Sequence, residues 1–215
     1  MKKEIVKLIN KMQGKYNTYE LFMDWVKCMA ISIHNTCHLI QDETWRMREQ
    51  EYLKIINKYN KEERDMFAQM FNMLALTLEN NITDALGEIY MEAGCGNKGT
   101  GQFFTPFHVS EMMARLNLPD KIENKLIINE PSCGAGGIIV AMCKFYKERG
   151  VDYQHKVKVV TQDLDWNAVY MTYVQISLLG VDGIVYQGDT LCDPDTSKYS
   201  RYRVFETPTR MGLLA

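Results

Sequence analysis

A glycine-rich loop occupies residues 130–137, where the sequence reads Glu-Pro-Ser-Cys-Gly-Ala-Gly-Gly. Ile127 and Ile128 precede it and the apolar run 138–142 follows it, so the pattern predicts a strand, a tight loop and a helix. Glycine allows a sharp turn and lets a ligand approach the main chain closely. The free N–H groups at the start of a helix favour an acidic or hydrogen-bond-accepting group. The loop therefore has the features of a nucleotide-binding cradle.

Acidic residues follow two further predicted strands. The run 157–160 leads to Asp163, and the run 183–187 leads to Asp189. Residues 168–179 between them have a helical pattern. Strands that alternate with helices predict a parallel, doubly wound sheet, in which ligands lie at the carboxyl ends of the strands. We therefore expect both acidic residues and the glycine loop to meet at one edge of the sheet.

The sequence of the loop excludes the common phosphate-binding patterns. It has no Gly-Lys-Ser/Thr, and Cys-Gly-Ala-Gly-Gly does not give the Gly-x-Gly-x-x-Gly order of dinucleotide folds. Glu130 would also repel a pyrophosphate. Asp163 can accept hydrogen bonds from both hydroxyls of a ribose, each contributing about 1.5–3 kcal/mol, and Asp189 can meet an exocyclic amine. An adenosine that carries an amino acid fits these groups, which predicts S-adenosylmethionine as the cofactor.

Composition and charge limit the possible partners. The chain has 215 residues, enough for one domain, or for one domain with a helical appendage. Hydrophobic residues make up 46% and charged residues 24%, which is ordinary for a globular protein. The net charge of −2 gives no overall attraction to nucleic acid. Any contact with DNA must therefore use a local patch or a partner.

The sequence also indicates where the protein resides. No apolar run is long enough to span a bilayer, and the N-terminus lacks the apolar core of a signal peptide. The six cysteines show no paired short spacing, which disfavours a structural zinc site. Scattered free thiols suit a reducing compartment. We therefore expect a cytoplasmic protein that contacts no membrane and holds no metal.

Apolar residues at three- and four-residue spacing predict a helical region over residues 1–95, followed by the sheet-forming part over residues 96–215. The helical stripes lie within 5–12, 21–37, 52–59 and 66–78, and a short helix begins at Asp84. His34 and His38 are four residues apart, which is a metal-ligand spacing on a helix. No third ligand is evident nearby, so a role in the core or at a helix end is expected.

Several segments of this chain resemble those of the N6-adenine DNA methyltransferases, in particular the methylase (M) subunits of type I restriction-modification systems. They occur in the order of that family and cover residues 84 to about 195. Each is short, but the combination is specific. The segments are Asp84-Ala-Leu-Gly-Glu-Ile-Tyr90, Gly101-Gln-Phe-Phe-Thr-Pro106, the glycine loop 130–137, Gln162-Asp163 and Gly188-Asp-Thr-Leu191.

The resemblance implies a truncated, Rossmann-like methyltransferase sheet after the helical region, and a role for each matching residue. Residues 104–106 would line the pocket and hold the methionine end of the cofactor, although alone they are typical of a hydrophobic staple before a helix. The glycine loop would contact the cofactor, Asp163 its ribose, Leu164 its adenine face and Asp189 its adenine amine. The expected cofactor-binding residues are Phe104, Thr105, Pro106, Glu130, Pro131, Ser132, Gly134, Gly136, Asp163, Leu164 and Asp189.

The catalytic motif of the family, Asp/Asn-Pro-Pro-Tyr/Phe, is missing, since the sequence contains no Pro-Pro pair. Residues 202–205 are the expected fourth strand, and Glu206-Thr-Pro-Thr209 stands where the motif belongs. Glu206 is the candidate catalytic residue, because it can accept a hydrogen bond, but Thr209 cannot stack on a flipped base. Only three or four of the family's seven strands fit, and the region that recognises the target is missing.

Two interpretations account for this departure: a small degenerate relative, or a sheet whose open edge is covered by a second copy or a partner subunit. Two functions follow. The chain is a DNA N6-adenine methyltransferase, with catalysis completed by a partner or by Glu206. Alternatively, it is a cofactor-binding pseudo-methyltransferase that regulates or assembles with restriction or DNA-processing machinery. An RNA or protein methyltransferase is a further alternative. DNA is an expected partner because of the resemblance and not because of charge.

Overall fold

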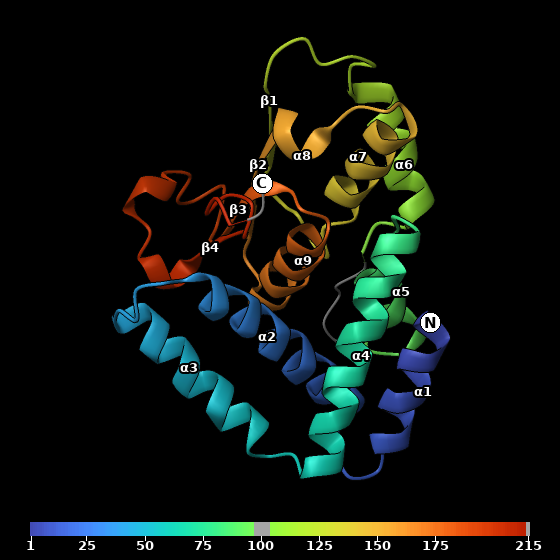
Figure 1. Ribbon diagram of the computed structural model, residues 1–215, viewed down its shortest axis with the longest axis vertical. Helices are drawn as coiled ribbons and strands as arrows, with labels where there is room; N and C mark the ends of the chain where they lie inside the picture. The colour runs from blue at the N-terminus through green and yellow to red at the C-terminus, as the bar shows by residue number, and fades with distance from the viewer. Residues whose placement is uncertain (97–103, 214–215) are drawn as a thin grey trace.

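The computed structural model describes residues 1–96 and 104–213 (Figure 1). Residues 101–103 of the predicted Gly-Gln-Phe-Phe-Thr-Pro segment lie outside the described residues, and so do residues 97–100 of the polar stretch before it. The helices that precede the sheet are α1 (Lys2–Met12), α2 (Thr18–Cys37), α3 (Glu43–Ile56), α4 (Lys61–Asn80), α5 (Ala85–Glu92) and α6 (Phe107–Asn117). The N-terminal helical region that the predicted fold class includes is therefore confirmed.

Short polar side chains determine where most of these helices begin. Asn17 and Asp42 accept hydrogen bonds from backbone N–H groups in the first turns of α2 and α3. Asn60 forms a capping box with Glu63 at the start of α4, in which each side chain accepts from the other residue's backbone. Asp84 caps α5 by accepting from the N–H of Gly87. The boundaries of the helical region thus follow from local sequence.

The sheet begins after α6, and its elements alternate as the sequence predicts. They are β1 (Leu126–Glu130), α7 (Gly137–Glu148), α8 (Tyr153–Lys156), β2 (Val157–Asp163), α9 (Trp166–Leu178), β3 (Asp182–Gln187), the short 3-10 helices η1 (Thr196–Lys198) and η2 (Arg201–Arg203), and β4 (Val204–Glu206). The strand order is β1-β2-β3-β4. The first three strands are parallel, with Glu130 opposite Thr161 and Asp163 opposite Gln187, so their carboxyl ends share one edge.

The fourth strand differs from the expected parallel arrangement. β4 runs antiparallel to β3 and pairs Glu206 with Ile184. Thr207 extends this contact, because its N–H donates to the carbonyl of Gly183 and its hydroxyl donates to the carbonyl of Val181. An antiparallel strand needs only a return connection, whereas a parallel one needs a longer crossover, usually a helix. The two 3-10 helices of the 188–203 connection provide such a return.

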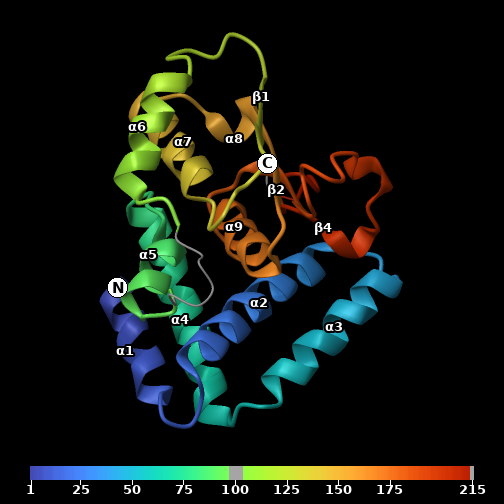
Figure 2. The ribbon, with the colours of Figure 1, turned by 180° about the vertical axis from the view of Figure 1, so that it is seen from behind.

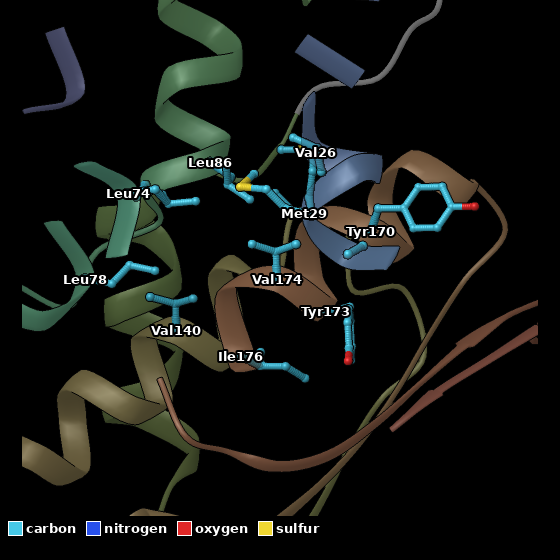
Figure 3. Packing of buried hydrophobic residues seen from close by; sticks show 14 of the residues in the cluster. Val26, Met29, Leu74, Leu78, Leu86, Val140, Tyr170, Tyr173, Val174 and Ile176 are labelled. Carbon is cyan, nitrogen blue, oxygen red and sulfur yellow. The ribbon is translucent and has the colours of Figure 1, made fainter. Parts of the chain in front are cut away.

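Helix α9 lies at the centre of the molecule, between the sheet and the helical region (Figures 1 and 2). Every residue from Ala168 to Ser177 is buried, so the helix is covered on all sides. The side chains that meet around it belong to different helices, and Figure 3 labels Val26 and Met29 of α2, Leu74 and Leu78 of α4, Leu86 of α5 and Val140 of α7. One hydrophobic core therefore runs across the boundary predicted at residues 95 and 96, and that boundary stays a prediction.

Arg48 of α3 ties the helical region to β4. Its side chain is 1% exposed, and its guanidinium donates to the carbonyls of Tyr202 and Val204 at 3.0 and 2.7 Å. The guanidinium also lies 3.9 Å from the ring centre of Phe205 and donates to the ring of His34. Burial, followed by the charge of Arg48, lowers the pKa of His34 to about 3. His34 is therefore an uncharged core residue at neutral pH, as the sequence favours.

No helix among the described residues combines the length and the apolar character needed to cross a membrane. The same residues contain no group of three or more histidine, cysteine or acidic side chains arranged to hold a metal ion.

We expect the substitution Arg48→Ala to lower the free energy of unfolding by about 3 kcal/mol, because buried carbonyls of residues 201–204 lose their donor. Urea unfolding followed by circular dichroism measures the change. Arg46→Ala, at an exposed position of the same helix, is the matched control and should alter stability by less than about 0.5 kcal/mol. Equal effects of the two substitutions would show that Arg48 does not anchor β4.

Candidate cofactor site

The glycine loop joins β1 to α7, so the predicted strand, loop and helix are confirmed. Gly134 and Gly136 adopt the left-handed conformation, with φ of +55° and +92°. A Cβ on Gly134 would lie 3.2 Å from Cδ1 of Phe104, and one on Gly136 would lie 3.1 Å from Oγ1 of Thr172. Both the backbone conformation and the close neighbours therefore require glycine at these two positions.

The end of β2 and helix α9 hold the loop in place. The carboxylate of Asp163 accepts from the N–H of Gly134 at 2.9 Å, and the N–H of Cys133 donates to the carbonyl of Gln162 at 3.0 Å. From the other side, the hydroxyl of Thr172 donates to the carbonyl of Gly134 at 2.9 Å. The amide and the carbonyl of Gly134 are thus fixed by two different elements.

Gln175 of α9 connects the loop to the helical region. Its side chain is fully buried, and its amide nitrogen donates to the carbonyl of Ala135 at 2.7 Å and to Oδ1 of Asp84 at 2.8 Å. Its amide oxygen accepts from the N–H of Leu86 at 3.2 Å. A single side chain therefore joins α9, the glycine loop and the start of α5.

An inner cavity of about 260 Å³ lies between the glycine loop and the segment that precedes α6. Phe104 and Thr105 form one wall, and Gly134 with Asp163 forms another. The ring of Phe104 is held at 5.1 Å from that of Tyr90. The residues that line the inner cavity are Asp84, Phe104, Thr105, Ser110, Ser132, Cys133, Gly134, Ala135, Gly137, Ile138 and Asp163.

An outer cavity of about 340 Å³ adjoins the inner one and shares Ser132 and Asp163 with it. Leu164 and Leu191 present exposed apolar side chains there, 65% and 93% exposed, which suits the faces of a flat ring. The residues that line the outer cavity are Pro131, Ser132, Asp163, Leu164, Gly188, Asp189, Thr190 and Leu191. Both cavities open at the carboxyl ends of the parallel strands, where ligands of such sheets bind.

The electrostatics of the two cavities favour a cationic ligand. Aspartates line both of them, and no lysine or arginine is among the described residues that do so. Burial raises the pKa of Asp84. Burial, and then the charge of Asp163, raises the pKa of Glu130. The backbone N–H groups of Cys192 and Leu191 lower the pKa of Asp189, so this carboxylate stays charged at neutral pH.

The family model described as N-6 DNA methylase matches residues 81–207. This range includes every residue that lines the inner and outer cavities. The chain belongs to the N-6 DNA methylase family. The predicted family and fold class are thereby confirmed.

One solved structure with a similar fold is the type I restriction-modification system methyltransferase subunit from Streptococcus thermophilus. The two chains are 13% identical, and the TM-score is 0.45. The similarity covers 93% of this chain and 59% of the subunit, so the chain spans less than two thirds of that protein's length. A comparison with curated proteins gave no match.

The structure brings most of the predicted site residues together at the two cavities, and three lie beside them. Pro106 precedes α6 and lines a third cavity of about 620 Å³, which also contacts Phe104 and Thr105. Glu130 ends β1 and holds the loop by accepting from the N–H of Ser132. Gly136 packs against α9. These three positions shape the site without lining the inner or the outer cavity.

Glu206 is the predicted site residue that the structure places elsewhere. It lies on β4 opposite Ile184, whereas the cavities lie beyond Asp163 and Gln187 at the other end of the strands. It lines a separate cavity of about 440 Å³ with His38 and Arg48. Because β4 joins the outer side of β3, Glu206 does not reach the cofactor site as the predicted fourth strand requires.

Sequence reasoning did not assign Asp84, Ser110, Cys133 or Leu191 to the site. Asp84 stands three residues before Gly87, a spacing that indicates a helix cap. This spacing does not indicate that Asp84 lies against the inner cavity. Cys133 belongs to the glycine loop, where burial raises the pKa of its thiol to about 12 and keeps it uncharged. Ser110 carries no local signal, since only the packing of α6 on α7 brings it to the cavity.

We expect Gln175→Ala to destabilise the protein by about 3 kcal/mol, because the carboxylate of Asp84 and the N–H of Leu86 lose buried partners. Chemical unfolding in urea quantifies the loss. Gln69→Ala, at an exposed position of α4, should change stability by less than about 0.5 kcal/mol. A cost below about 1 kcal/mol for Gln175→Ala would argue against its role as the connecting side chain.

Proposed function

We propose that this chain binds S-adenosylmethionine across the inner and outer cavities and serves the N6-methylation of adenine in DNA. Methylases of this family generally use S-adenosylmethionine. The observation that carries the proposal is the position of Asp163, which lines both cavities at the carboxyl end of β2. A ribose at this carboxylate would direct its base into one cavity and its sulfur substituent into the other.

The outer cavity suits the adenine ring. Leu164 and Leu191 offer apolar contact to the faces of the ring, and Asp189 offers a charged acceptor for its exocyclic amine. Oδ2 of Asp163 accepts from the backbone N–H of Gly134, and Oδ1 accepts from that of Asp165. Because a carboxylate oxygen accepts more than one hydrogen bond, both oxygens keep capacity for the ribose hydroxyls. The inner cavity then receives the amino-acid end beside Phe104 and Thr105.

We propose that the groups which hold the target adenine come from a partner subunit or a second copy of the chain. Two features support this proposal: the sequence contains no Pro-Pro pair, and Glu206 lies on the outer side of β3. Within the described residues β1 pairs on one side only, with β2, and Ile127 on it is 69% exposed. This free edge is where a second polypeptide would complete the sheet. Because the cavities are acidic and repel phosphates, we expect the partner to supply the contacts with DNA.

The missing Pro-Pro pair favours a second function as well. In that case the chain binds the cofactor and acts as a regulatory or assembly module of restriction or DNA-processing machinery, without methyl transfer. The two functions share the cofactor site and differ in chemistry.

Asp163→Asn tests the shared site. We expect it to weaken the binding of S-adenosylmethionine about 10- to 150-fold, because the ribose loses charge-assisted hydrogen bonds. Isothermal titration calorimetry gives the dissociation constants. Asp65→Asn, at an exposed position of α4, should bind as the wild type does. The absence of binding heat with wild-type protein would contradict the cofactor assignment.

Methyl transfer from labelled S-adenosylmethionine to adenine-containing DNA separates the two functions. We expect the purified chain alone to transfer no methyl group, because no group in the described structure is placed to accept the target amine. Addition of the partner that co-purifies with the chain should start transfer, and Asp163→Asn in the same complex should reduce it. Transfer by the chain alone would overturn the need for a partner, and an inactive complex would support the regulatory function.

A further inference from the structure

The carboxylate of Asp84 lines the inner cavity, and one of its two oxygens accepts hydrogen bonds from described residues. Asp84 is 3% exposed and lines the cavity. Its Oδ1 accepts from the N–H of Gly87 at 2.9 Å and from Gln175 at 2.8 Å. Its Oδ2 accepts no hydrogen bond from the residues that the structure describes. A buried carboxylate oxygen that remains unpaired is costly, so its place at a cavity indicates a ligand.

Backbone packing holds Oδ2 in this position. A Cβ on Gly87 would overlap Oδ2, and one on Gly137 would lie 3.0 Å from it. The carboxylate therefore has room at the cavity because glycine stands in the first turn of α5 and at the first position of α7. Gln175 fixes the opposite oxygen, so the carboxyl group cannot turn away from the cavity without losing that bond.

Ser110 supplies a second unpaired group at the same place. It is 0% exposed, it lines the inner cavity, and its Oγ has no hydrogen-bond partner in the described part of the chain. Oγ lies 3.5 Å from the position of a Cβ on Gly137, which is also the neighbour of Asp84 Oδ2. A hydroxyl and a carboxylate oxygen thus converge beside one glycine.

No lysine or arginine of the described residues forms an ion pair with Asp84. Lys2, whose charge acts on Asp84, forms its ion pair with Glu88. Burial consequently raises the pKa of Asp84, which indicates a carboxylate that gains from a positive ligand. The lining also includes the apolar side chains of Phe104, Ala135 and Ile138, which suit a short methylene chain.

We propose that Asp84 Oδ2 and Ser110 Oγ bind the ammonium group of an α-amino-acid moiety, namely the methionine end of S-adenosylmethionine. An ammonium group has three N–H donors and no acceptor, and it matches a carboxylate oxygen and a hydroxyl oxygen that both lie beside Gly137. The free carboxylate end of the same moiety is repelled by Asp84 and faces Thr105 instead. This inference rests on the proposed function and assigns part of the cofactor's specificity to the helical region.

Three ligands test the assignment on the intact protein: S-adenosylhomocysteine, its analogue without the α-amino group, and 5′-methylthioadenosine, which lacks the whole amino-acid end. We expect the wild type to bind S-adenosylhomocysteine about 10-fold or more tightly than the analogue without the amine, because a charge-assisted bond is lost. Isothermal titration calorimetry measures all three affinities. Equal affinity for these two ligands would overturn the inference.

Two variants test the residues themselves. Asp84→Asn keeps an acceptor for the N–H of Gly87. It should weaken the binding of S-adenosylhomocysteine about 10-fold and change the affinity for 5′-methylthioadenosine by less than about twofold. Ser110→Ala should weaken the binding of S-adenosylhomocysteine about 3- to 10-fold. Ser200→Ala and Asp65→Asn, at exposed positions, are the matched controls. Equal weakening of both ligands would show that Asp84 only supports the loop.

The outcomes separate this inference from the proposed function. A wild type that binds none of the three ligands contradicts the proposed function. A wild type that binds all three ligands, but with equal affinity for S-adenosylhomocysteine and its analogue without the amine, contradicts the inference alone. Thermal unfolding of each variant checks its folding. If Asp84→Asn does not fold, Ser110→Ala and the wild-type ligand comparison still decide, because Ser110 Oγ makes no hydrogen bond to the described residues that its loss would remove.

Discussion

The burial of α9 is the constraint on which the rest of the structure depends. A helix that is covered on every side has no solvent to satisfy its polar side chains, so Thr172 and Gln175 must find partners in the protein. They find them in the carbonyls of the glycine loop and in Asp84. The same contacts that satisfy the core therefore shape the candidate cofactor site.

The site is built from both parts of the chain. The sheet contributes the glycine loop and the acidic residues at its carboxyl edge, and the helical region contributes Asp84. Arg48 and β4 join the two parts at a second point, away from the loop. The geometry of the cavities consequently depends on residues that lie far from them in the sequence.

Much of the fold could be predicted from local sequence patterns. The strand, loop and helix at 127–142 and the acidic residues after β2 and β3 could be predicted because neighbouring residues determine them. The direction of β4 could not, since residues 202–206 carry no local signal for it and both the return connection 188–203 and the contacts of Arg48 are tertiary features. The sequence predicts Asp84 as a helix cap, but its place in the lining of the inner cavity depends on the position of α7. Ser110 had no local signal at all.

The position of Gln175 has a consequence for how this protein can change over evolutionary time. Its amide contacts Asp84, Leu86 and Ala135 together, and Asn167 of the same helix donates to the hydroxyl of Tyr19. A homologous helical region from another methylase could replace residues 1–95 only if it carried matching partners for α9. Recombination at this boundary would therefore be disfavoured, and the residues on its two sides should vary together among relatives.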